Sequence, residues 1–92
     1  MSTFFMIGKY SADALKKISA ERTEKAIALV KEHGGELKSG YALLGENDLI
    51  LIVDLPNPEQ AIKTSVALTK MLDIAFNTAS AITMEEFDKI TG

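Results

Sequence analysis

Four stretches of the chain are rich in apolar residues and predict strands. Residues 3–10 are rich in aromatic and β-branched side chains, and we interpret residues 36–44 and 74–82 as the second and fourth strands. Residues 49–55 are apolar almost without interruption. A strand of this kind is buried on both faces, so we expect residues 49–55 to lie centrally in the sheet.

Two longer segments between these strands have the apolar spacing of helices. Residues 19–33 begin at a potential cap, Ser19, and end before Gly34-Gly35. Residues 57–72 begin with Asn57 as cap and Pro58 at the first helical position. The face predicted to be buried in the first helix consists of Thr23, Ala26, Ile27, Val30 and His33, and that in the second of Ile62, Val66, Thr69 and Leu72.

Shorter signals complete the pattern. Ser11 and Asp13 can bond nearby backbone, which favours a turn or a short helical piece after the first strand. Thr83 and Glu86 form a capping box that opens a last helix through Ile90. Asp73 stands at the end of the second long helix, where we expect a left-handed backbone, which Asp tolerates better than most residues.

The order of these elements predicts an α+β fold. It is β-α-β-β-α-β with a short C-terminal helix, which is the ferredoxin-like arrangement, in a single domain over residues 1–92. We expect an antiparallel sheet of order 4-1-3-2 with both long helices on one face. In the first and third strands the residues pointing to either face are apolar. The helices cover only one face, so we expect a second copy of the chain to cover the other, sheet against sheet.

Composition excludes several classes of function. Ten basic residues against 13 acidic ones give a net charge of -3, which disfavours binding to nucleic acid or to an anionic membrane. The chain has no cysteine and one histidine, so we expect no thiolate chemistry, no metal site and no cofactor. No apolar run approaches the roughly 20 residues of a membrane span, and no leader is evident, so we expect a soluble cytoplasmic protein.

The sequence resembles the GYD-domain family over nearly its whole length. The residues that carry the resemblance are Tyr10, Arg22, Gly34-Gly35, Tyr41, Gly45, Asp48, Asp54, Pro56 and Glu86-Phe87. In the name-giving motif, Gly45-Glu46-Asn47-Asp48, Asn47 stands where Tyr is usual. The resemblance implies a dimeric α/β barrel, and it implies no particular reaction.

A few polar residues are candidates for a ligand site. Asp54 closes the apolar third strand, where a carboxylate can act as a base or simply meet solvent as the strand emerges. Tyr10 and Tyr41 can offer hydroxyl groups to a ligand or lie at the edge of the core, and Asn77 puts an amide on the fourth strand. His33 is at a helix end, where the helix dipole favours histidine.

Three functions follow from these observations. The first is a homodimer that binds a small molecule in a pocket between sheet and helices, lined by Tyr10, Tyr41, Asp54 and Asn77. The second is a cofactor-independent enzyme, an oxygenase or isomerase, in the same pocket. The third is a structural or regulatory assembly subunit without a ligand.

Overall fold

One antiparallel sheet forms the centre of the molecule. The structure is a computed structural model, and it describes residues 1–92. The strands are β1 (Ser2–Tyr10), β2 (Glu36–Ala42), β3 (Leu49–Leu55) and β4 (Ile74–Ala81), in the order β2-β3-β1-β4. This order confirms the ferredoxin-like topology predicted from the sequence, with β3 in the interior of the sheet.

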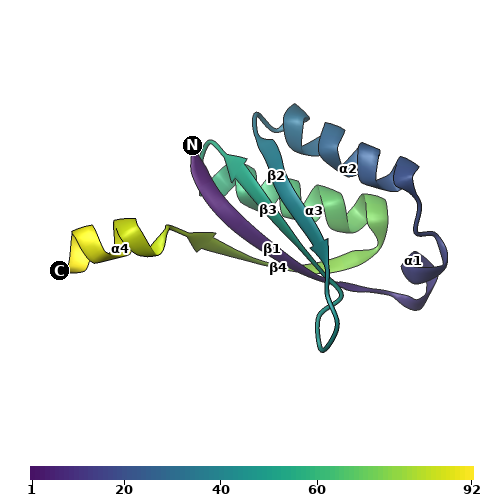
Figure 1. The fold of residues 1–92 in the computed structure, drawn as a ribbon. Helices are drawn as coiled ribbons and strands as arrows, with labels where there is room; N and C mark the ends of the chain where they lie inside the picture. The colour runs from purple at the N-terminus through teal and green to yellow at the C-terminus, as the bar shows by residue number, and fades with distance from the viewer.

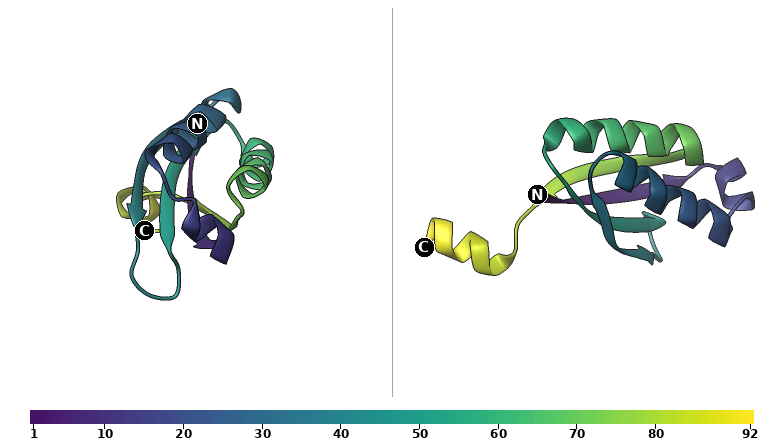
Figure 2. Two further views of the ribbon diagram at one scale, coloured as in Figure 1. Left: turned by 90° about the vertical axis from the view of Figure 1, so that its right-hand side faces the viewer. Right: turned by 90° about the horizontal axis from the view of Figure 1, so that it is seen from above.

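Both long helices lie on the same face of the sheet (Figure 1). They are α2 (Ala20–Glu32) and α3 (Pro58–Leu72), and two short helices, α1 (Ala12–Lys16) and α4 (Met84–Thr91), follow β1 and β4. The opposite face, called the open face below, carries no helix (Figure 2). None of the helices is both long and apolar enough to span a membrane.

The predicted caps begin the helices as expected. The side chains of Ser19, Asn57 and Thr83 accept hydrogen bonds from the backbone N–H groups three residues later, at 3.2, 2.9 and 3.1 Å. Asp73 ends α3 with φ 56° and ψ 45°, which confirms the left-handed backbone. Gly34 ends the turn after α2 with φ +82°. His33 is the C-cap of α2, and its Nδ1 lies 2.9 Å from the carbonyl oxygen of Leu29.

The core lies between the sheet and the two long helices. Its fully buried side chains include Met6 and Val53 from the sheet and Val30 and Leu68 from the helices. In α2 the buried residues are Ala26 and Val30, both predicted, whereas Thr23 is exposed and Ile27 and His33 are half-buried.

For α3 the predicted buried face is wrong except at its end. The helix buries Ala61, Thr64, Leu68 and Leu72, while Ile62 and Val66 are exposed. Apolar residues occupy two stripes of this helix, and the stripe that includes Ala61 and Leu68 faces the sheet. Thr64 lies in this stripe, and its hydroxyl donates a hydrogen bond to the Gln60 carbonyl at 2.7 Å.

Candidate functional site

A pocket opens on the helix-covered face of the sheet, between the strands and helices α1 and α2. The sheet contributes its floor, which consists of Tyr10, Leu37, Leu49, Leu51 and Ile74. The helices and the segment between α1 and α2 contribute Ala14, Ile18, Ser19, Arg22, Thr23, Ala26 and Leu72. Nine of these 12 residues are hydrophobic, and the space they surround is about 80 Å³. The pocket is therefore small and mostly apolar.

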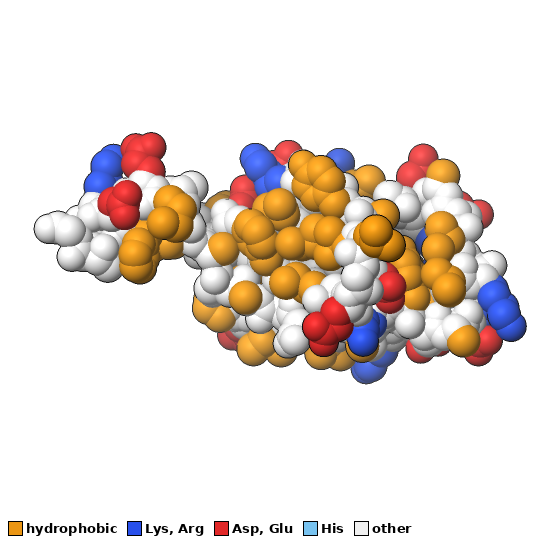
Figure 3. Space-filling view, turned by 60° about the horizontal axis from the view of Figure 1, so that its bottom comes forward, with side chains coloured by type: hydrophobic (Ala, Val, Ile, Leu, Met, Phe, Trp, Pro, Cys, Tyr) orange, Lys and Arg blue, Asp and Glu red, His pale blue; other side chains and the backbone are white.

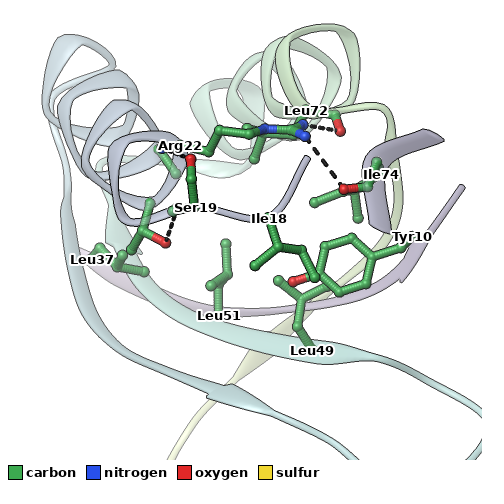
Figure 4. Close-up of a pocket in the computed structure, with 12 residues that line it drawn as sticks. Tyr10, Ile18, Ser19, Arg22, Leu37, Leu49, Leu51, Leu72 and Ile74 are labelled. Carbon is green, nitrogen blue, oxygen red and sulfur yellow. Dashed lines mark hydrogen bonds between the residues drawn. The ribbon is translucent and has the colours of Figure 1, made fainter. Parts of the chain in front are cut away.

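Arg22 is the only side chain in this lining that carries a permanent charge. It lies opposite the sheet residues, across the top of the pocket (Figure 4). Its Nη1 donates to the Ala14 carbonyl at 3.4 Å, and its Nη2 donates to the carbonyl of Leu72. The guanidinium thus ties α2 to α1 and to the last turn of α3, where helix carbonyls lack partners.

The same guanidinium has donors to spare. It carries five N–H groups, of which these two bonds use two, and it forms no salt bridge with a carboxylate of the chain. A half-buried arginine without an acidic partner, beside an apolar pocket, is suited to receive an anionic group from a ligand.

Tyr10 places its ring in the pocket beside Ile18 and Leu49 (Figure 4). It is at the end of β1, and its backbone N–H donates to Oδ2 of Asp48 at 2.9 Å. No aspartate, glutamate, histidine or cysteine lines the pocket. The lining thus offers apolar surface, one cation and hydroxyl groups.

The other three predicted ligand residues lie on the open face. In the strand register, Tyr41 pairs with Ile50, Asn77 with Ile7, and Asp54 with Thr3, all on the face away from the helices. The prediction that all four residues line one pocket between sheet and helices is therefore corrected: only Tyr10 does. Whether any of them binds a ligand stays a prediction.

A bulge in β2 explains the position of Tyr41. Leu37 pairs with Val53, but Ser39 pairs with the next residue of β3, Ile52, so the strand has one extra residue at Lys38. Because side chains alternate along a strand, this extra residue moves every later side chain of β2 to the other face. Tyr41 consequently lies on the open face, with 59% of its surface exposed.

Asp54 lies at the edge of the open face in a polar cluster. Its Oδ1 accepts a hydrogen bond from the Thr3 hydroxyl at 2.8 Å, and its Oδ2 is 3.8 Å from Nζ of Lys38. The side chain is 23% exposed. These contacts join β3 to both of its neighbours, which is a structural role at the end of the sheet.

The motif residues Gly45 and Asp48 belong to the hairpin between β2 and β3. Gly45 has φ +134°, a backbone conformation that residues other than glycine rarely adopt. Asp48 donates its N–H to the Gly8 carbonyl at 2.9 Å and accepts the N–H of Tyr10. The Asp48 carboxylate forms no salt bridge, and it is turned to the backbone of β1 instead.

Sequence reasoning missed Arg22 and Ile18 as pocket residues. Arg22 had a signal, since it follows Ser19 in the slot where a capping box prefers Glu or Gln. Ile18 stands just before the cap and shows no periodicity of its own. No group of three or more His, Cys, Asp or Glu side chains is arranged to hold a metal ion.

Comparison with known proteins gives a family and a fold. The model of the GYD domain matches residues 4–91. No curated protein sequence matches the chain. Among solved structures, the leucine response regulatory protein of Mycobacterium tuberculosis is similar with a TM-score of 0.60 and 11% identity, over 90% of this chain and 51% of that one. A glutamate-to-alanine mutant protein is similar with a TM-score of 0.59 and 14% identity, again over 90% and 51%. The chain spans about half the length of these structures, and the likeness is one of fold.

Proposed function

The chain belongs to the GYD domain family, and on that premise we propose that it is a homodimer that binds a small carboxylate with a short aliphatic tail in the pocket below Arg22. The observation that carries the proposal is the combination of an apolar pocket with a guanidinium that forms no salt bridge.

The size of the pocket limits the tail of the ligand. An apolar cavity of roughly 150 Å³ holds a benzene molecule, whereas this pocket surrounds about 80 Å³. A short straight or branched aliphatic group fits, and an aromatic ring does not. The remainder of the ligand then lies at the open mouth, within reach of Arg22.

The charge of Arg22 selects the other end of the ligand. Guanidinium and carboxylate groups match in geometry, and hydrogen bonds between ionised partners are about twice as strong as neutral ones. The likeness in fold to a protein named for its response to leucine carries no ligand to this chain. The proposed class of ligand rests on the pocket alone.

The open face supports the proposed homodimer. Phe5, Ile7, Ile50 and Ile52 lie on it and are only half-buried, with no helix to cover them. Figure 3 shows hydrophobic side chains gathered on this side of the molecule. A second copy is the partner that the chain itself supplies, as the sequence suggested.

A cofactor-independent enzyme has less support than a ligand-binding protein. An oxygenase or isomerase that needs no cofactor requires a group that moves a proton, and of the titratable side chains in the pocket only Tyr10 is able to do so. The cytoplasmic location and the single-domain organisation stay predictions.

Titration by nuclear magnetic resonance tests the ligand proposal. With 3-methylbutanoate as probe we expect saturable shifts at Tyr10, Ile18 and Leu49. Its amide, which has the same shape without the charge, should bind about tenfold more weakly, since the Arg22 guanidinium then meets a neutral acceptor instead of a carboxylate. Equal binding of acid and amide would contradict the role of Arg22, and no saturable shift with either would contradict the pocket.

Two variants provide a matched control. Ile18→Asp and Ile62→Asp each replace an exposed isoleucine by a carboxylate. Ile18 is 59% exposed and Ile62 is 65% exposed, but only Ile18 lines the pocket. Ile18→Asp should abolish binding of 3-methylbutanoate and Ile62→Asp should leave it unchanged. Loss of binding in both variants would mean that the effect is one of general charge and not of this pocket.

A further inference from the structure

A second hollow adjoins the apolar pocket at Arg22. Helix α1, the start of α2 and the end of α3 meet there, at one end of the molecule (Figure 2). The hollow surrounds about 350 Å³, and it shares Ala14, Arg22 and Leu72 with the pocket. Sites that bind small molecules in proteins have volumes of roughly 300–1,000 Å³. The hollow is therefore large enough for a small molecule.

The lining of this hollow is mostly charged, whereas the lining of the pocket is mostly apolar. The cations are Lys17, Arg22, Lys25 and Lys70, and the carboxylates are Asp13 and Asp73. Two positive charges are therefore in excess, in a chain whose net charge is -3. Four of the ten basic residues of an acidic protein are gathered around one hollow.

The carboxylates of the lining do not neutralise these cations. Neither Asp13 nor Asp73 forms a salt bridge, and Oδ2 of Asp73 accepts the Ser11 hydroxyl at 2.5 Å. Among the four cations only Lys25 has an acidic partner, Glu21 at 3.4 Å, and both side chains are largely exposed. Exposed pairs of this kind are weak, so the positive charge of the hollow remains available.

The ends of the helices explain only part of this cluster. Lys17 is the C-cap of α1 and Lys70 is in the last turn of α3, and the helix dipole favours a cation at both positions. Arg22 and Lys25 are in the first half of α2, where the dipole does not favour a cation. Their position beside the two lysines points to an anion from outside the chain.

Arg22 supplies directed donors at the wall of the hollow. Its bonds to the carbonyls of Ala14 and Leu72 use two of its five N–H groups (Figure 4). A guanidinium binds the oxygens of a phosphate in a fixed geometry, and a lysine adds charge without a fixed direction. A phosphate monoester has three acceptor oxygens and a charge of about −1.5 to −2 at neutral pH. This charge matches the excess of two in the lining.

We propose that the hollow binds the phosphate group of a small phosphate monoester, held by Arg22 and by Lys17, Lys25 and Lys70. The inference goes beyond the carboxylate site proposed above and does not rest on it. Arg22 is the one charged residue that the two sites share.

Titration with glycerol 3-phosphate, followed by nuclear magnetic resonance, tests this site. At about pH 8 the ester is a dianion, and in about 0.1 M sodium chloride the Debye length is about 10 Å, which weakens non-specific attraction. We expect saturable shifts of the backbone signals of Lys17, Arg22 and Lys70, and no shift with glycerol. Inorganic phosphate should bind no more tightly than the ester. A response to inorganic phosphate alone would restrict the hollow to the free ion and overturn the proposed ligand.

Two double variants form a matched pair. Lys17→Gln/Lys70→Gln removes two cations of the hollow, at the end of α1 and in the last turn of α3. Lys16→Gln/Lys31→Gln removes two lysines from the last turns of α1 and α2 that do not line it. All four lysines are exposed and form no salt bridge, and both variants lose the same charge. The first variant should bind glycerol 3-phosphate about tenfold more weakly, and the control should change by less than about twofold.

Two results would overturn the site. Equal weakening in both double variants would mean that the charge of the whole protein attracts the ester, and no saturable shift in the unchanged protein would mean that the hollow binds no phosphate group. Titration of the same proteins with 3-methylbutanoate keeps the two proposals apart. Binding of that acid without binding of the ester refutes the hollow alone, and the converse refutes the apolar pocket alone.

Discussion

The two faces of the sheet are built from the same strands but differ in how far their side chains are buried. In β3, Leu51, Val53 and Leu55 point toward the helices and are buried, while Ile50 and Ile52 between them point to the open face and stay half-exposed. Both sets are apolar. The difference is thus not in the strand but in what lies above it, because two helices cover one face and no element of the chain covers the other.

The two faces also separate the two proposed functions. The covered face holds the core and the pocket with Arg22, so the proposed ligand binding needs only one chain. The open face carries half-buried apolar residues that no helix covers, so the proposed association needs two chains. A change on one face should therefore leave the other function intact.

Neighbouring residues of β1 provide the strongest test of this division. Met6 is fully buried below the helices, and Ile7 lies on the open face. Met6→Ala should lower the free energy of unfolding by about 2–5 kcal/mol, the usual cost of such a cavity. Ile7→Ala should cost the single chain much less, but it should raise the dissociation constant of the dimer.

Urea denaturation and sedimentation measure the two effects. We expect the loss in Met6→Ala to be the same at every protein concentration. The unfolding midpoint of Ile7→Ala should depend on concentration less steeply than that of the unchanged protein, because a smaller fraction of the variant is associated. Equal effects of both variants on the dissociation constant would break the distinction between the faces.

Arg22 offers a smaller test on the covered side. Arg22→Gln removes the charge and weakens the bonds to Ala14 and Leu72, which should cost about 1–2 kcal/mol in a thermal melt. Binding of 3-methylbutanoate should fall with it, whereas the dimer mass should not change. A variant that binds the acid as well as the unchanged protein would restrict Arg22 to its role between the helices.

The smallest effect is expected at Asp73, which lines neither the pocket below Arg22 nor the open face. Asp73→Gly relieves the left-handed backbone at the end of α3 but gives up the bond from the Ser11 hydroxyl, 2.5 Å from Oδ2. It also adds entropy to the unfolded chain. These terms oppose one another, so we expect a change within about 0.5 kcal/mol. A loss of several degrees in the melting temperature would mean that the Ser11 bond outweighs the backbone strain.

Local signals in the sequence predicted the fold well. The bounds of β3, the caps Ser19, Asn57 and Thr83, and the backbone of Asp73 each depend on residues close in the chain, and all are confirmed. The strand order followed from the order of elements.

The site was harder to predict because it depends on which face each residue occupies. Both faces of the strands are apolar, so alternation alone does not tell which set meets the helices, and Asp54 and Asn77 fell on the other side. The bulge at Lys38 places Tyr41 on the open face, because the extra residue reverses the alternation of side chains along β2. In α3 apolar residues occupy two stripes, and their spacing alone does not tell which stripe meets the sheet.

The mass of the protein in solution tests the central claim most directly. If a second copy covers the open face, sedimentation equilibrium at micromolar concentration should give twice the mass of one chain, and Ile52→Asp should reduce it to that of one folded chain. A monomer in the unchanged protein would contradict the proposed homodimer, because the apolar open face would then have to exist uncovered in water.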